Sequence, residues 1–185
     1  AVVNVHSLAD VLEDHLRRRE LPAVTISDER DRLLETGGGM VKAAGLLPDP
    51  FFCVNSDNLW LDGPKNALQD LSDRWNADEM DALLLLVPHK GAMNFPGKGD
   101  FHMDAVGRLR RRRSGRIAPY IFTAIQLVSK RLLRDAPEGP FSTNILWDRA
   151  IAEDRLFGVA FTGRWFEVGT PQAIRPTEAA LATGL

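Results

Sequence analysis

The sequence holds a single cysteine, Cys53, and contains no long hydrophobic run. One cysteine cannot form an internal disulfide, and its place within an apolar segment predicts a buried, inert thiol, as is usual in reducing compartments. The longest apolar stretch, residues 82–87, is far too short to span a bilayer, and no secretory signal is visible. These absences lead us to expect a cytoplasmic protein with no membrane partner.

An excess of charge of one sign is also lacking. The formal net charge of the 185 residues is −2, which argues against general nucleic-acid binding. The basic run from Arg108 to Arg113 could form a local basic patch, but no aromatic residue interleaves its arginines. We therefore interpret the run as solvated surface.

Several common catalytic and nucleotide-binding motifs are missing. The glycines at positions 37–39 are not followed by the Gly-Lys-Ser/Thr ending of a P-loop, and their spacing is not that of the dinucleotide fingerprint. A dinucleotide-dependent oxidoreductase therefore has little support. The four histidines show no metal-ligand spacing, and no Ser/His/Asp or Cys/His arrangement can be argued.

The sequence does contain alternating strand and helix patterns. Continuous apolar segments predict strands, and apolar residues at helical spacing predict helices. We expect strands at 2–5, 23–26, 51–55, 80–87, 119–124, 157–161 and 165–168, and helices at 7–19, 40–46, 65–75, 144–153 and 170–181. This alternation indicates a βαβ architecture with a largely parallel sheet.

Three of these elements carry more specific expectations. The apolar stripe of the first helix, formed by Leu8, Val11, Leu12 and Leu16, should face the sheet. The strand at 51–55 should be buried on both faces, because its apolar run is unbroken. The last two strands should pair as a hairpin around the Thr-Gly at positions 162–163.

Three consecutive glycines, Gly37, Gly38 and Gly39, precede the helix predicted at 40–46. Each glycine costs roughly 1 kcal/mol relative to alanine inside a helix. A flexible turn would explain them simply. Their cost favours instead a close approach to the backbone, either by a ligand or by a neighbouring strand.

Two carboxylates lie near the ends of predicted strands. Asp57 follows the strand at 51–55, where open α/β sheets bind ligands, although it could be an ordinary turn residue. Glu167 lies in the strand that ends at Gly169, although it could be a plain exposed strand residue. Together they could hold Mg²⁺ against the phosphates of a nucleotide. Asn55 and Asn58 flank Asp57 and could orient a hydrated ion.

Four segments in chain order carry a resemblance to a known family: Glu35-Thr36-Gly37-Gly38-Gly39, Val54-Asn55-Ser56-Asp57, Gly99-Asp100-Phe101 and Trp165-Phe166-Glu167-Val168-Gly169-Thr170-Pro171. They resemble the sugar-1-phosphate nucleotidyltransferases, and within these the N-acetylmuramate-1-phosphate uridylyltransferases and mannose-1-phosphate guanylyltransferase-like proteins. The resemblance runs from residue 1 to about residue 180. It implies a single domain over 1–185 of the nucleotide-diphospho-sugar transferase type, a Rossmann-like three-layer α/β sandwich with a mostly parallel mixed sheet.

The resemblance also implies a reaction and a site. A sugar 1-phosphate would condense with a nucleoside triphosphate, UTP or GTP, giving a nucleotide-sugar and pyrophosphate in cell-wall nucleotide-sugar biosynthesis. Asp57 would be the catalytic residue and a ligand of Mg²⁺, and Glu167 would be the second metal ligand. Residues near the nucleotide would be Glu35, Thr36, Gly37, Gly38 and Gly39. Gly99 and Asn144 would lie near the sugar.

The sequence departs from this family at three places. The family's N-terminal glycine-rich loop with an arginine, and the Pro-Lys-Pro segment after it, are not in these residues. We expect an N-terminally incomplete domain that lacks at least one strand–loop–helix unit of roughly 30 residues, and no activity from residues 1–185 alone. Glu167 replaces the usual aspartate, and Ala124 stands where relatives often have glycine. A degenerate, non-catalytic module that binds a nucleotide or sugar is therefore the alternative, and the oligomeric state is left open.

Overall fold

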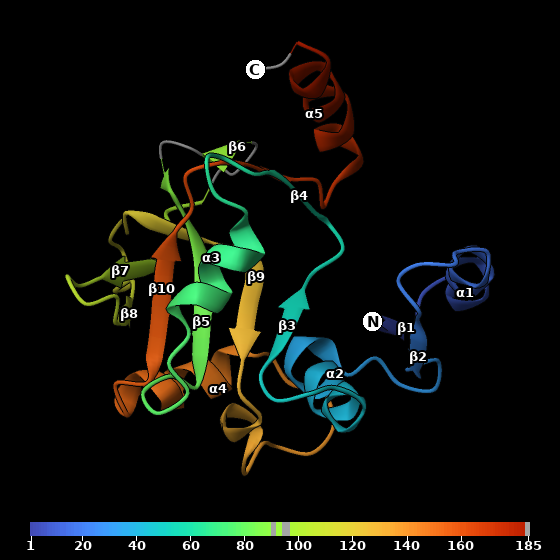
Figure 1. The fold of residues 1–185 in the computed structure, drawn as a ribbon, viewed down its shortest axis with the longest axis horizontal. Coiled ribbons are helices and arrows are strands. Elements are labelled where there is room, and N and C mark those ends of the chain that lie inside the picture. Colours follow the sequence, from blue (N-terminus) through green and yellow to red (C-terminus); the bar gives the residue numbers. More distant parts are fainter. Residues whose placement is uncertain (90–91, 94–96, 184–185) are drawn as a thin grey trace. The chain divides into compact units, whose positions relative to one another are not determined.

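Strand β5 (Ala82–Pro88) runs through the largest sheet of the computed structural model, which describes residues 1–89, 92–93 and 97–183. The strand order is β10-β5-β9-β7-β8, and β3 also pairs with β9. Figure 1 shows β10, β5, β9 and β3 side by side. β5 is parallel to β10 and antiparallel to β9, so the sheet is mixed, as expected. The pairs β7–β8 and β7–β9 are also antiparallel, so the sheet is less parallel than predicted. The bounds of the other strands are β3 (Phe51–Val54), β7 (Phe101–Met103), β8 (Leu109–Arg111), β9 (Tyr120–Val128) and β10 (Leu156–Ala160).

The chain divides into two compact units. The first comprises residues 1–51 and 129–149, and the second comprises residues 52–128 and 150–185. The first unit contains β1 (Val2–Val5), α1 (Ala9–Arg17), β2 (Thr25–Asp28) and α2 (Glu35–Ala43), and α4 (Asn144–Ala152) begins in it. The second contains the large sheet, β4 (Asn58–Leu61), α3 (Ala67–Arg74), β6 (Ala92–Met93), β11 (Arg164–Glu167) and α5 (Pro171–Ala182). A single domain over 1–185 stays a prediction.

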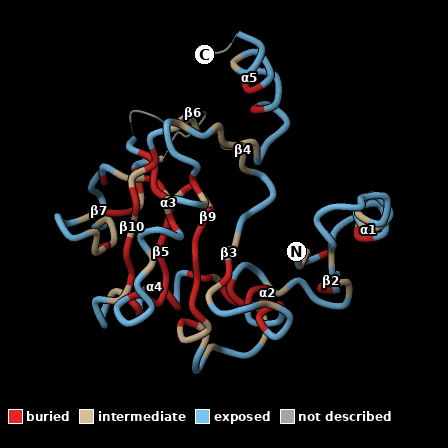
Figure 2. Tube along the Cα trace, in the orientation of Figure 1, coloured by how far each residue is buried: buried red, intermediate tan, exposed pale blue. Residues whose placement is uncertain are grey.

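The core of the second unit lies between α3 and the large sheet. All of β5 except Pro88 is buried, which explains its unbroken apolar sequence (Figure 2). The core cluster is formed by apolar side chains of α3, β5, β9, β10 and β11, among them Leu71, Leu83, Leu85, Ile121, Ile125, Val159 and Trp165. Helix α3 begins where the side chain of Asn66 accepts a hydrogen bond from the N–H of Gln69.

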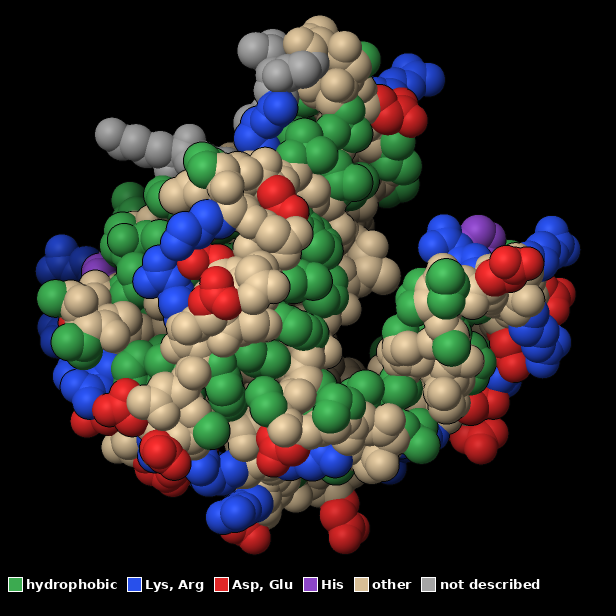
Figure 3. Space-filling view, in the orientation of Figure 1, with side chains coloured by type: hydrophobic (Ala, Val, Ile, Leu, Met, Phe, Trp, Pro, Cys, Tyr) green, Lys and Arg blue, Asp and Glu red, His purple; other side chains and the backbone are tan. Residues whose placement is uncertain are grey.

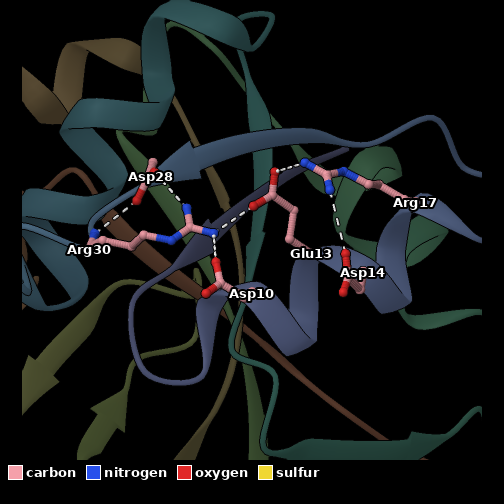
Figure 4. A network of polar contacts seen from close by, with 6 residues as sticks. All are labelled: Asp10, Glu13, Asp14, Arg17, Asp28 and Arg30. Carbon is pink, nitrogen blue, oxygen red and sulfur yellow. Dashed lines mark hydrogen bonds and ion pairs between the residues drawn. The ribbon is translucent and has the colours of Figure 1, made fainter.

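Arg30 organises the charged surface of the first unit. Its guanidinium contacts the carboxylates of Asp10, Glu13 and Asp28 (Figure 4). The hydrogen bonds that the guanidinium donates raise the pKa of Arg30, and the bond to Glu13 contributes most. The backbone N–H of Arg30 donates to Asp28 and lowers the pKa of that carboxylate. Acidic and basic side chains are interspersed on the face drawn in Figure 3. Among the described residues, no helix is long and apolar enough to cross a membrane.

The predicted orientation of the first helix is wrong for Leu8, Val11 and Leu12, which are exposed, and holds only for Leu16. Leu8 and Val11 are 79% and 67% exposed, whereas Ala9 is buried and Glu13 and Leu16 are half-buried. The inward residues therefore follow the spacing 9, 13 and 16. Glu13, on this inward side of α1, forms an ion pair with Arg30, which follows β2.

Two expectations about strands are also wrong. β3 is not buried on both faces, since Phe52 and Val54 are exposed; among the described residues it has one strand partner, β9. The last two strands do not form a hairpin. β10 joins β5 in the large sheet, whereas β11 pairs with β4 and β6 in a separate three-stranded sheet.

Candidate active site

Asp57 and Glu167 lie at adjoining ends of two antiparallel strands. Asp57 immediately precedes β4 and Glu167 is the last residue of β11, and the register sets Glu167 opposite Asn58. The N–H of Val168 donates to the carbonyl oxygen of Asp57 at 2.9 Å. The structure thus brings the two predicted metal ligands to one end of the β4–β11 pair.

Negative charge accumulates around Glu167. Partial burial raises the pKa of Glu167, and the carboxylates of Asp57 and Asp100 raise it further. Asp100 is held at the start of β7, where its Oδ2 accepts a hydrogen bond from the N–H of Phe122 at 2.9 Å. We did not predict a role for Asp100, although it lies in the Gly99-Asp100-Phe101 segment. Neighbouring carboxylates that repel one another form an electrostatic environment that favours a cation.

The donor set at this end of the strands fits a hard cation. Within residues 1–89, 92–93 and 97–183, no three Asp, Glu, His or Cys side chains gather so as to hold a metal ion together. The candidate metal site therefore has two carboxylate ligands from the protein, those of Asp57 and Glu167. Mg²⁺ is commonly held in this way, by one or two carboxylates, with substrate phosphates and water completing its coordination.

The two oxygens of the Asp57 carboxylate have different surroundings. Oδ1 accepts a hydrogen bond from Nδ2 of Asn58 at 2.7 Å. Oδ2 faces Gly169, where a Cβ would stand 3.1 Å from it. Asp57 and Gly169 are both exposed, so a side chain at position 169 would crowd the Oδ2 side of the carboxylate.

The glycines at 37–39 are part of a helix rather than a turn before it. We predicted that the helix begins near Met40, but α2 begins at Glu35. The N–H groups of Gly37 and Gly38 donate to the carbonyl oxygen of Phe141 at 2.9 and 3.3 Å. Helix starts leave such N–H groups without partners, and here a carbonyl from the segment before α4 satisfies them.

Close packing explains why these positions are glycine. All three are buried. A Cβ on Gly37 would collide with the ring of Phe141, and a Cβ on Gly38 would collide with the carbonyl oxygen of Gly139. A Cβ on Gly39 would lie 2.9 Å from Oε1 of the buried Glu29. The sequence left open an approach by a ligand or by a neighbouring strand. The groups that approach these glycines belong to the protein, but Gly139, Phe141 and Glu29 lie outside the strands.

Glu35 and Thr36 remain exposed at the start of α2. Oγ1 of Thr36 accepts a hydrogen bond from the N–H of Thr143 at 3.1 Å, which joins the start of α2 to the start of α4. Asn144, the first residue of α4, directly follows Thr143 in the sequence, and its side chain is exposed. The predicted nucleotide residue Thr36 and the predicted sugar residue Asn144 are thus brought together within the first unit, and their contact with substrate stays a prediction.

Gly99 lies in a turn that a side chain would block. Its φ is +77°, and a Cβ would collide with the carbonyl oxygen of Ala118. Nε of Arg112 donates to the carbonyl oxygen of Gly99 at 2.8 Å, so the basic run holds this turn in place. Contact of Gly99 with a sugar stays a prediction.

The interpretation of the basic run as solvated surface is wrong for part of it. Arg108, Arg111 and Arg112 are half-buried, whereas Arg110 and Arg113 are exposed. The guanidinium carbons of Arg108 and Arg111 lie 5.7 and 5.2 Å from aromatic ring centroids, those of the phenylalanines at 157 and 101. Phe157 is distant in sequence and Phe101 lies opposite Arg111 across the β7–β8 pair, so neither interleaves the run itself.

Cys53 was predicted to be a buried, inert thiol, and the structure buries it only in part. It is half-buried, and burial raises the pKa of the thiol, which keeps it in its less reactive protonated form.

Comparison with known proteins places this geometry in a family. No family model matches the chain. The N-acetylmuramate α-1-phosphate uridylyltransferase of Caulobacter vibrioides is 40% identical over 187 residues, a match that covers 98% of this chain and 77% of the relative.

Solved structures show the same fold. HddC from Yersinia pseudotuberculosis, complexed with GMP-PN, matches with a TM-score of 0.70 at 15% identity, covering 95% of this chain and 75% of that one. The inositol-1-phosphate CTP transferase from T. maritima matches with a TM-score of 0.67 at 13% identity, covering 93% and 70%. The expected nucleotide-diphospho-sugar transferase fold is therefore confirmed. By its identity to the Caulobacter enzyme over nearly its whole length, the chain belongs to the N-acetylmuramate α-1-phosphate uridylyltransferase family of sugar-1-phosphate nucleotidyltransferases.

Proposed function

We propose that this chain transfers a uridylyl group from UTP to N-acetylmuramate α-1-phosphate, giving UDP-N-acetylmuramate and pyrophosphate. The observation that carries the proposal is the 40% identity to a uridylyltransferase of that name over 98% of the chain. The meeting of Asp57 and Glu167 at one end of β4 and β11 supports it, because such a site suits phosphoryl chemistry. Between the two bases expected from the sequence, the relative favours UTP over GTP.

The proposed reaction is a direct displacement at phosphorus. A phosphate oxygen of the sugar 1-phosphate forms a bond to the α-phosphorus of UTP, while the bond from that phosphorus to the bridging oxygen of the β-phosphate breaks. The bonding electron pair leaves with pyrophosphate, so no covalent enzyme intermediate is needed. Catalysis of such a step consists mainly of aligning two anions and balancing their charge.

The chain's own residues divide these tasks. Asp57 and Glu167 would hold Mg²⁺, which when bound supplies positive charge against the triphosphate. Glu35 and Thr36 contact the nucleotide from the start of α2. Gly37, Gly38 and Gly39 seat that helix start against Phe141 and so position the contact. Gly99 and Asn144 contact the sugar.

A non-catalytic binding module is the weaker candidate. The relative carries the name of an enzyme, and both carboxylates predicted to hold the metal are present and adjoining. Calorimetry separates the two functions. UTP binding that depends on Mg²⁺ supports the transferase, whereas binding of UDP-sugar alone, unaffected by metal, supports the module.

Pyrophosphate release tests the proposed substrates. The complete gene product is incubated with each of the four nucleoside triphosphates and with N-acetylmuramate α-1-phosphate, glucose 1-phosphate or mannose 1-phosphate. We expect the highest rate with UTP and N-acetylmuramate α-1-phosphate, and no release when Mg²⁺ is chelated. A preference for another pair would correct the substrate assignment, and no release with any pair would contradict the transferase.

A further inference from the structure

Trp165 and Asn58 form a polar contact next to the candidate metal ligand Asp57. Trp165 lies on β11 and is only 2% exposed, yet its indole N–H requires a hydrogen-bond acceptor. Nε1 donates to Oδ1 of Asn58 at 3.0 Å and to the carbonyl oxygen of Thr123, in β9, at 3.1 Å. The Asn58 side chain is therefore anchored to a buried residue of the core.

This anchor determines which way the Asn58 amide points. An indole nitrogen can only donate, so it must face the oxygen of the amide and not its NH₂ group. The NH₂ group is thereby turned toward Asp57, where it donates to Oδ1 at 2.7 Å. Without the indole, the amide could rotate and present its oxygen to the carboxylate, which would be repulsive.

We propose that Asn58, held by Trp165, is a positioning residue for the metal-binding carboxylate of Asp57. The hydrogen bond to Oδ1 fixes the rotation of the carboxylate. Oδ2 is left for the cation, on the side of Gly169, where a Cβ would lie 3.1 Å from it. The inference rests on the proposed function, because it assumes that Asp57 binds a divalent metal.

The arrangement differs from ordinary strand packing. Asn is disfavoured in strands, and here it occupies the first position of β4 directly opposite Glu167. Side chains that face each other across an antiparallel pair lie on one face, so the Asn58 amide adjoins both candidate metal ligands. Groups that hydrogen-bond a metal ligand typically change metal affinity when they are removed.

The test measures binding of Mn²⁺, as a paramagnetic probe, to the complete gene product by electron paramagnetic resonance. The variant Asn58→Ser has a side chain too short to span Trp165 and Asp57. We expect it to weaken Mn²⁺ binding about tenfold or more. Trp165→Phe keeps the buried ring but removes the N–H, and we expect a fall of about fivefold, the equivalent of one neutral hydrogen bond.

A matched control is available in the same unit. Nδ2 of Asn66 also donates to a carboxylate oxygen at 2.7 Å, that of Asp62, but at the start of α3. Asn66→Ser retains a helix-capping side chain and should leave Mn²⁺ affinity unchanged. Thermal melts of every variant separate a loss of affinity from a loss of folding.

The outcomes distinguish this inference from the proposed function. If Asp57→Asn abolishes Mn²⁺ binding while Asn58→Ser and Trp165→Phe bind as the wild type does, the metal site stands and the positioning role is refuted. A lowered melting temperature without a change in affinity also refutes it, because it shows a purely structural role. If Asp57→Asn binds Mn²⁺ normally, the metal site of the proposed function fails, and the positioning role fails with it.

Discussion

Gly169 stands against the carboxylate of Asp57, close enough that a Cβ would lie 3.1 Å from Oδ2. Gly169→Ala should therefore displace the carboxylate by a few tenths of an ångström. We expect the Mg²⁺ concentration that supports half-maximal pyrophosphate release to rise about tenfold. The thermal midpoint should hardly change, because residue 169 is exposed. An unchanged Mg²⁺ requirement would show that Oδ2 does not contact the cation.

The buried glycines of α2 should be intolerant of alanine. A Cβ on Gly38 would collide with the backbone carbonyl of Gly139, which cannot rotate away as a side chain would. We expect Gly38→Ala to lower the free energy of unfolding by about 2–3 kcal/mol. In denaturant titrations, the matched control is Gly45→Ala, because a Cβ on Gly45 meets nothing within 4 Å. That control should be neutral, or stabilising by up to about 1 kcal/mol. Equal effects would contradict the packing described for α2.

Glu167 makes the stability of the protein depend on pH. The pKa of Glu167 is raised above its ordinary value of 4.5, so the folded state binds this proton more tightly than the unfolded state. Ionisation of Glu167 therefore lowers the free energy of unfolding. This loss is absent below pH 4.5, the ordinary pKa, and develops as the pH rises through the raised pKa of the folded state. Glu167→Gln should raise the melting temperature near pH 7.5 and leave it almost unchanged near pH 4.

The control for this pH effect is Glu153→Gln, which removes one exposed carboxylate at the end of α4. It should show no comparable difference between the two pH values. If Glu167→Gln raised the melting temperature equally at both pH values, charge repulsion around Glu167 would not be the source of the increase.

Ala124 occupies a backbone conformation that suits glycine. Its φ is +61°, in β9, where the pairing with β5 shifts register between Leu84 and Leu86. A non-glycine residue costs roughly 1–2 kcal/mol in this region, partly offset by the larger unfolded-state entropy of glycine. Ala124→Gly should stabilise the protein by about 0.5–1 kcal/mol. In calorimetry, Ala160→Gly in the regular strand β10 should have the opposite sign, and destabilisation by both would contradict the strain at Ala124.

The sequence predicted the elements of the fold better than their environment. Strand β1 was placed at its observed bounds, and β5 was recognised because burial on both faces leaves an unbroken apolar run. The orientation of α1 was not predictable from apolar spacing, because its inward residues include the charged Glu13, which pairs with Arg30. The separation of β10 and β11 into two sheets depends on pairing with β5 and β4, which are far away in the chain.

The candidate site shows the same limit. The sequence singled out Asp57 and Glu167, and the structure sets them at adjoining strand ends. The contribution of Trp165 could not be foreseen, since its N–H reaches Asn58 only through the β4–β11 register. The glycines of α2 were recognised as a close approach, but the sequence could not say that Phe141, about a hundred residues later, is what approaches.

The most direct test of the account is Mn²⁺ binding by the Asp57 and Glu167 variants of the complete gene product. Electron paramagnetic resonance reports the concentration of free Mn²⁺. The control variant is Asp73→Asn, which removes an unrelated carboxylate on α3. We predict one ion per wild-type chain, with affinity lost in Asp57→Asn, lowered in Glu167→Gln and retained in Asp73→Asn. Wild-type affinity for Mn²⁺ in the Asp57→Asn variant would contradict a divalent metal held between these two strands.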